Sequence, residues 1–136
     1  IIELSNLLMQ YLSKGKNMMY RENLQQLIMQ QQKLFKELQQ NKTEDVIARF
    51  RENDKKILAE FSVNLNDTVD YYNTCNADEL LLLSILIIDL SKHFRSNELV
   101  NCFENRVDRL EDGSLKKSLK LEVDFIKSSL KDEFFI

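Results

Sequence analysis

The apolar residues of this chain recur with helical spacing, and the most apolar stretch runs from Leu80 to Ile88, where a single serine is the only polar residue. Just before it, Asn76 and Glu79 have the side chains of a helix N-cap and of the position three residues later. A helix that is apolar on nearly all sides has to be covered on nearly all sides. The pattern therefore predicts a buried central helix at residues 77–93, around which the other segments pack. The side chains expected to be most deeply buried are Leu83, Leu86 and Ile87.

Two segments upstream of this helix are predicted to form a long antiparallel hairpin, with helices at about 17–40 and 44–73. The first carries a seam with the 4-3-4-3 spacing of a heptad repeat, at Leu24, Ile28, Gln31, Phe35 and Leu38. The second carries a stripe at Ile47, Phe50, Asp54, Ile57, Phe61, Leu65, Val69 and Tyr72. Folding about the joint sets Gln31 opposite Asp54, so we expect a hydrogen bond that fixes the register. The alternative is that one of these two side chains points to water.

Beyond Ile57 the spacing of the second stripe becomes 4-4-4, which predicts a bend or a change of packing partner near residues 64–67. After the central helix, two further helices are expected. The first begins at Ser96 or Asn97 and ends before Gly113, a residue that suits a left-handed cap. Its stripe is Leu99, Val100, Phe103, Val107 and Leu110. The second begins at Ser114, with Leu115, Leu119, Val123, Ile126 and Leu130 on one face, widened by Leu121 and Phe125.

An additional stripe over residues 1–12 predicts an N-terminal helix that ends near Gly15. Together the elements predict an all-α bundle of five to six helices in a single domain, residues 1–136. The long hairpin is expected to pack with a compact C-terminal three-helix set around 77–93. The composition agrees, because the chain has no proline, two glycines, 43% hydrophobic and 30% charged residues, which is typical of a globular protein with short joints. The chain begins with Ile1 and not with Met, so we expect a fragment or a processed form.

No apolar run approaches the roughly 18 residues that span a membrane, and the first residues lack the pattern of a signal peptide. The single histidine, His93, follows Asp89 by one helical turn, but no cysteine or second histidine is spaced to complete a metal site. Cys75 and Cys102 fit no disulfide or metal framework and are expected to be buried thiols in a reducing compartment. Two isolated glycines exclude a P-loop or dinucleotide fingerprint. We therefore expect no catalytic residue, no metal and no cofactor.

The net charge is -3, and the clusters of lysine and arginine are interleaved with acids, so direct nucleic-acid binding is not expected. The sequence favours a non-enzymatic, cytoplasmic protein-interaction module. Such a module would be an adaptor, a chaperone, an immunity-type inhibitor, or an oligomerisation or regulatory domain that can form a homodimer. The alternative is the effector or dimerisation domain of a transcription regulator whose DNA-binding part lies outside this chain, and a helical enzyme or metal protein comes third. The candidate partner surface consists of Met18, Met19, Met29, Tyr71, Tyr72, Phe134, Phe135 and Ile136.

Overall fold

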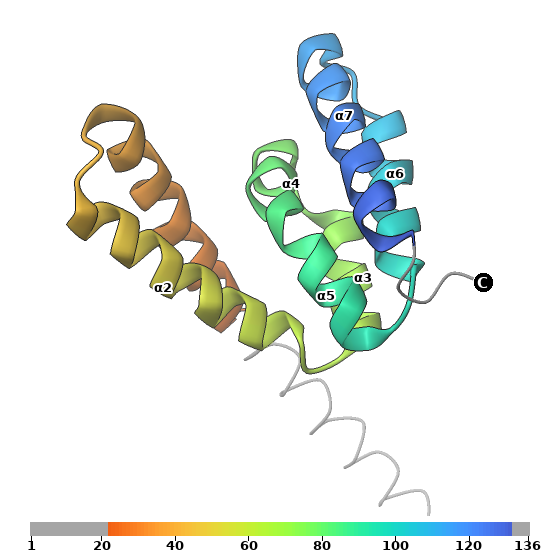
Figure 1. Ribbon diagram of the computed structural model, residues 1–136, viewed down its shortest axis with the longest axis horizontal. Coiled ribbons are helices and arrows are strands. Elements are labelled where there is room, and N and C mark those ends of the chain that lie inside the picture. Colours follow the sequence, from red (N-terminus) through yellow and green to blue (C-terminus); the bar gives the residue numbers. More distant parts are fainter. Residues whose placement is uncertain (1–21, 132–136) are drawn as a thin grey trace, which may run out of the picture. The chain divides into compact units, whose positions relative to one another are not determined.

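The computed structural model describes residues 22–131, and Figure 1 draws the residues outside this range as a grey trace. The helix predicted at 1–12 and the cap predicted at Gly15 lie outside the described residues. Within the described range every regular element is helical and no strand occurs, which confirms the all-α class. The chain divides into two compact units, Ile1–Glu60 and Phe61–Ile136. The expectation of a single domain stays a prediction.

The first unit contains a helix over residues 22–40 and most of α2 (Glu44–Phe61), joined by residues 41–43. The Thr43 hydroxyl accepts a hydrogen bond from the Val46 N–H (3.3 Å) and so caps the start of α2. Phe35 contacts Phe50 with ring centroids 6.5 Å apart, and Asn23 donates to Glu60 (2.8 Å). Late residues of one helix therefore meet early residues of the other, which is the order of an antiparallel pair.

A polar network lies in the middle of this pair. The Gln31 side-chain amide donates to Asp54 Oδ1 (3.0 Å) and to the Phe50 carbonyl (3.3 Å). Asn53 donates to Gln31 Oε1 (2.8 Å) and to the Leu27 carbonyl (2.9 Å). Gln31 and Asn53 are both buried. The predicted bond between Gln31 and Asp54 is thus confirmed, and Asn53, which the spacing did not single out, shares its register role.

The second helix of the predicted hairpin is shorter than expected. It was predicted to run to residue 73, but α2 ends at Phe61 and a new helix, α3 (Leu65–Thr74), follows. The physical reason is Asn64, whose side chain accepts a hydrogen bond from the Asp67 N–H (3.0 Å) and so starts a new helix. The Thr68 hydroxyl also donates to the Phe61 carbonyl (2.6 Å), which satisfies a carbonyl at the end of α2. The predicted bend near 64–67 therefore corresponds to a full break.

The central apolar helix is divided into α4 (Ala77–Leu83), a single 3₁₀ turn η1 (Ser84–Leu86) and α5 (Ile87–Phe94). The Asn76 side chain accepts from the Glu79 N–H (2.9 Å), as predicted from their spacing. At the break, the Ser84 hydroxyl donates back to the Leu81 carbonyl (2.8 Å), a bond that competes with the helix. The Tyr72 hydroxyl donates to the Leu83 carbonyl (2.8 Å) at the same place.

The expectation that this segment is covered on nearly all sides is wrong on one side. The side chains of Leu83, Leu86 and Ile87 are buried, as predicted. Leu81 and Ile85, one turn apart on the opposite face, remain 44% and 59% exposed. The apolar run therefore has a core face and an outward face, which a continuous apolar sequence cannot distinguish.

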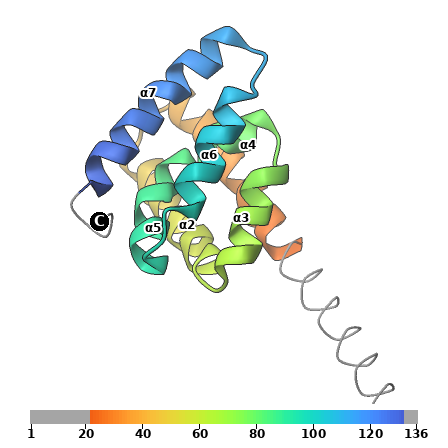
Figure 2. The same cartoon turned by 90° about the vertical axis from the view of Figure 1, so that its right-hand side faces the viewer.

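Two longer helices, α6 (Glu98–Asp108) and α7 (Gly113–Leu130), complete the second unit. There α6 packs against α3, α5 and α7, and α7 also packs against α5; Figures 1 and 2 show α6 and α7 side by side. Gly113 was predicted to be a left-handed cap, but it is the first residue of α7 and has no positive φ. The Asp112 carboxylate caps the start of α7, because it accepts hydrogen bonds from the N–H groups of Ser114 (3.0 Å) and Leu115 (3.1 Å).

Candidate functional site

The structure tests only part of the predicted partner surface. Met18, Met19 and the segment Phe134, Phe135 and Ile136 lie outside the described residues. Met29 is exposed on the 22–40 helix, so it is available for contact. The tyrosine pair is not available, because Tyr71 and Tyr72 are both buried in the second unit.

The two tyrosines hold the core of the second unit together. Both rings pack against Phe61, each with a centroid distance of 5.4 Å. The Tyr71 hydroxyl donates to Glu79 (2.8 Å), and the Tyr72 hydroxyl donates to the Leu83 carbonyl (2.8 Å). A buried tyrosine needs such a partner for its hydroxyl. Adjacent tyrosines at a helix end were predicted to form a surface, and that prediction is wrong.

A partly buried arginine contact, which could not be seen in the sequence, joins α6 to the C-terminal end of α3. The Arg106 guanidinium donates to the carbonyls of Tyr72 (2.7 Å) and Cys75 (2.6 Å). These carbonyls belong to the last turn of α3 and its cap, where backbone acceptors lack helical partners and the helix dipole favours a positive charge. No sequence pattern links residues so far apart in the chain, so this contact had no signal to reveal it.

The two cysteines are free and buried, as predicted. Burial raises the pKa of the Cys75 thiol from 9.0 to about 11, although the nearby Arg106 charge acts in the opposite direction. Burial also raises the pKa of Cys102. A thiol that stays protonated at neutral pH is a poor nucleophile. Both cysteines therefore behave as core side chains.

His93 is exposed near the end of α5. Its Nε2 lies 2.8 Å from the Ser62 carbonyl, and its ring contacts Phe94. Among residues 22–131 no group of histidine, cysteine and carboxylate side chains is arranged to hold a metal ion.

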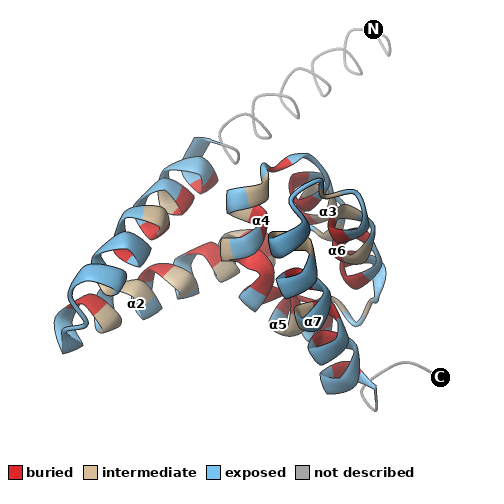
Figure 3. Ribbon diagram, turned by 90° about the horizontal axis from the view of Figure 1, so that it is seen from above, coloured by how far each residue is buried: buried red, intermediate tan, exposed pale blue. Residues whose placement is uncertain are grey.

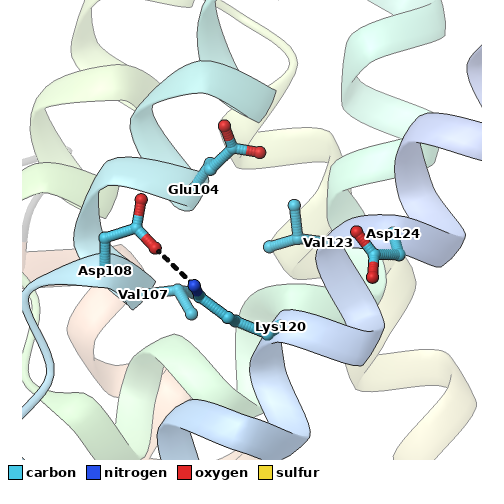
Figure 4. A pocket seen from close by; sticks show the side chains of 6 residues that line it. All are labelled: Glu104, Val107, Asp108, Lys120, Val123 and Asp124. Carbon is cyan, nitrogen blue, oxygen red and sulfur yellow. Dashed lines mark ion pairs between the residues drawn. The ribbon is translucent and has the colours of Figure 1, made fainter.

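A groove of about 360 Å³ lies between α6 and α7. Figure 4 shows the six side chains that line it, which are Glu104, Val107, Asp108, Lys120, Val123 and Asp124. Lys120 pairs with Asp108 (3.4 Å), and Lys127 pairs with Glu104 beside the groove. The charges of these pairs are thus matched across the two helices. Asp124 makes no such pair within the described residues, and it stands at the edge of the groove that borders the outward face of α7.

The outward face of α7 exposes two large apolar side chains. Leu121 is 67% exposed and Phe125 is 60% exposed, one helical turn apart. The inward face of the same helix is buried through Leu119, Val123, Ile126 and Leu130. Figure 3 shows α7 with buried residues along one side and exposed residues along the other. Leu121 and Phe125 were expected to widen the core face, and that expectation is wrong.

The exposed pair belongs to a longer pattern, which we call the outer seam. Ser114, Ser118, Leu121, Phe125 and Ser128 follow one another with 4-3-4-3 spacing. This is the spacing of the positions that meet a partner helix in a heptad repeat. In that numbering Lys117, Asp124 and Lys131 fall on one flank of the seam and Glu122 falls on the other. This spacing is present in the sequence, but Leu121 and Phe125 were assigned to the inward stripe, whose residues lie at neighbouring positions.

Comparison of the chain with family models, with curated proteins and with solved structures finds no match. Within the described residues no helix is both long enough and apolar enough to cross a membrane.

Proposed function

We propose that this chain is a non-enzymatic protein-interaction module and that the outer seam of α7 is its binding surface. The observation that carries the proposal is the exposure of Leu121 and Phe125 on a helix whose other face is fully packed. A leucine and a phenylalanine one turn apart are the usual anchors of a helix that binds another helix. Exposing both side chains to water has no structural benefit within this unit.

The surroundings of the pair suit a protein partner. Serines stand before and after the two large side chains along the seam, and small residues let a second helix approach closely. Exposed charges follow the seam on its flank, as in many helix-pairing surfaces. The cytoplasmic location expected from the sequence belongs to this proposal, and the free thiols of Cys75 and Cys102 support it.

The test compares two double variants of the full chain. Leu121→Ser with Phe125→Ser removes the apolar part of the outer seam, and Leu81→Ser with Ile85→Ser removes a matched exposed pair from α4 and η1. Each protein is immobilised, exposed to extract of its native host, and the retained proteins, copies of this chain included, are identified by mass spectrometry. We expect the α7 variant to lose a partner that both the unmodified chain and the α4 variant retain. Retention of every partner by the α7 variant would contradict the proposal.

A further inference from the structure

We infer that the partner of the outer seam is a second copy of this chain, so that two α7 helices pair about a two-fold axis. This inference rests on the proposed function, since it names the occupant of the same surface. It is carried by the charges that flank the seam, together with the seam's spacing.

Lys117 is the key flanking residue. It is exposed, and it makes no ion pair within the described range, whereas the neighbouring Lys120 and Lys127 are paired with carboxylates of α6. Lys117 lies one residue before a seam position, next to the place where a partner helix would lie. Asp124 lies one heptad later on the same flank, and it too is exposed.

Two-fold pairing of α7 with itself gives Lys117 a carboxylate partner in either direction. In an antiparallel pair, residues on the same flank meet, which brings Lys117 of one copy close to Asp124 of the other. In that register Leu121 packs against Ser118 of the second copy, and Phe125 against Ser114. In a parallel pair, opposite flanks meet with an offset of five residues, which brings Lys117 close to Glu122. Each attractive pair occurs twice in the dimer because of the symmetry.

The size of the seam sets the strength of the dimer. Each copy contributes two large apolar side chains and three serines to the contact. A contact of this size is at the low end for specific association, so we expect a reversible dimer that forms as the concentration rises. The ion pairs then contribute a measurable part of the stability of the dimer and make the association sensitive to salt.

The experiment measures the association of the full chain by sedimentation equilibrium over about a hundred-fold range of concentration. Lys117→Glu replaces two attractive pairs with two repulsive ones, so we expect it to weaken association by about ten-fold. The matched control is Lys131→Glu, which makes the same change of charge on the same flank but beyond the contact, and it should leave association unchanged. Phe125→Ser should abolish association.

Second-site charge reversal then tests the contact itself. Adding Asp124→Lys to Lys117→Glu should restore association if the helices are antiparallel, and adding Glu122→Lys should restore it if they are parallel. Restoration by either one supports the inference and gives the direction of the pair. Failure of both reversals to restore association would overturn it, as would association that survives Phe125→Ser or an unmodified chain that stays monomeric throughout. If the chain is monomeric while the Leu121 and Phe125 variant still loses another protein from host extract, the proposed function stands and only the second copy is excluded.

Discussion

The inner and outer faces of α7 have nearly the same spacing of seam positions, but they differ in how far their side chains are buried. The inner face is buried against α5 and α6, whereas the outer face leaves Leu121 and Phe125 largely exposed. Both sets of residues lie on one continuous helix, so the difference does not come from helix formation. It depends on whether another helix in the described part of the chain packs against that face. Seam spacing therefore predicts that a face packs against a helix, but it does not say which molecule provides that helix.

In the 22–40 helix, the burial of a polar seam residue likewise depends on a neighbouring helix. Gln31 occupies a seam position there and is buried, because α2 presents Asp54 and the Phe50 carbonyl to its amide and Asn53 donates to its oxygen. The serines of the outer seam of α7 occupy equivalent positions and are exposed. A polar seam residue is buried where a neighbouring helix offers hydrogen-bond partners.

The sharpest way to separate the two faces of α7 is to truncate one residue on each. Ile126→Ala opens a cavity in the packed inner face and should lower the free energy of unfolding by about 2–5 kcal/mol. Phe125→Ser, one residue away on the outer face, should change it by less than about 0.5 kcal/mol. Urea denaturation followed by circular dichroism measures both. Equal losses from the two variants would show that the outer face is packed within the chain.

The core of the second unit, which contains Cys75, should weaken at alkaline pH. The pKa of Cys75 is raised to about 11 in the folded chain from an ordinary value of 9.0. The folded state thus holds its proton where the unfolded state has lost it. The resulting contribution to stability is complete below pH 9 and is lost as the pH rises to about 11, with an upper bound of about 3 kcal/mol. The measurement is the free energy of unfolding against pH for the chain and for Cys75→Ala, which should lose less. Identical pH profiles would refute this role of Cys75.

The attachment of α6 to α3 depends on Arg106, and the inner face of α7 depends in turn on α6. Arg106→Leu removes two charge-assisted hydrogen bonds to carbonyls at the end of α3 and should cost about 2 kcal/mol. Arg106→Lys keeps the charge but cannot reach both carbonyls in the same way, so it should recover about half of that loss. Thermal and urea unfolding of the two variants give the comparison. A lysine variant no better than the leucine variant would mean that charge at this helix end contributes little.

The smallest expected effect concerns the polar seam of the hairpin. A double-mutant cycle of Gln31→Leu and Asp54→Leu should show a coupling energy of about 1 kcal/mol, because the two side chains share a partly buried hydrogen bond of 3.0 Å. Asn53 also contacts Gln31, so the same cycle with Asn53→Leu should show coupling of similar size. Strict additivity in both cycles would mean that the network does not set the register.

The sequence predicted those features that depend on neighbours along one helix or on two matched seams. The capping by Asn76, the Gln31–Asp54 bond and the burial of Ile87 all follow from local spacing and from polar residues that need a partner. The predictions of continuous helices were wrong where tertiary contacts or hydrogen bonds from a nearby side chain interrupt the helix. Ser84 and Asn64 interrupt helices that apolar periodicity alone would continue.

The candidate site was harder to predict than the fold. A pair of tyrosines occurs both in protein cores and on binding surfaces, so the residue types do not distinguish the two. The contacts with Phe61 and Leu83 show that Tyr71 and Tyr72 lie in the core. Leu121 and Phe125 were assigned to the core because every apolar residue of an amphipathic helix is expected to share one face. On α7 two apolar faces are present, and only the packing of α5 and α6 shows which one is occupied.

The most direct test of the outer seam compares two leucines two residues apart on α7. Leu119 is buried on the inner face, and Leu121 is exposed on the outer seam. In the full chain with ¹³C-labelled leucine methyl groups, NMR spectra are recorded as the protein concentration is raised. We expect the Leu121 methyl signals to shift with concentration while those of Leu119 stay in place. Leu121 signals that stay fixed over the whole range, or that move together with those of Leu119, would contradict pairing of two chains through α7.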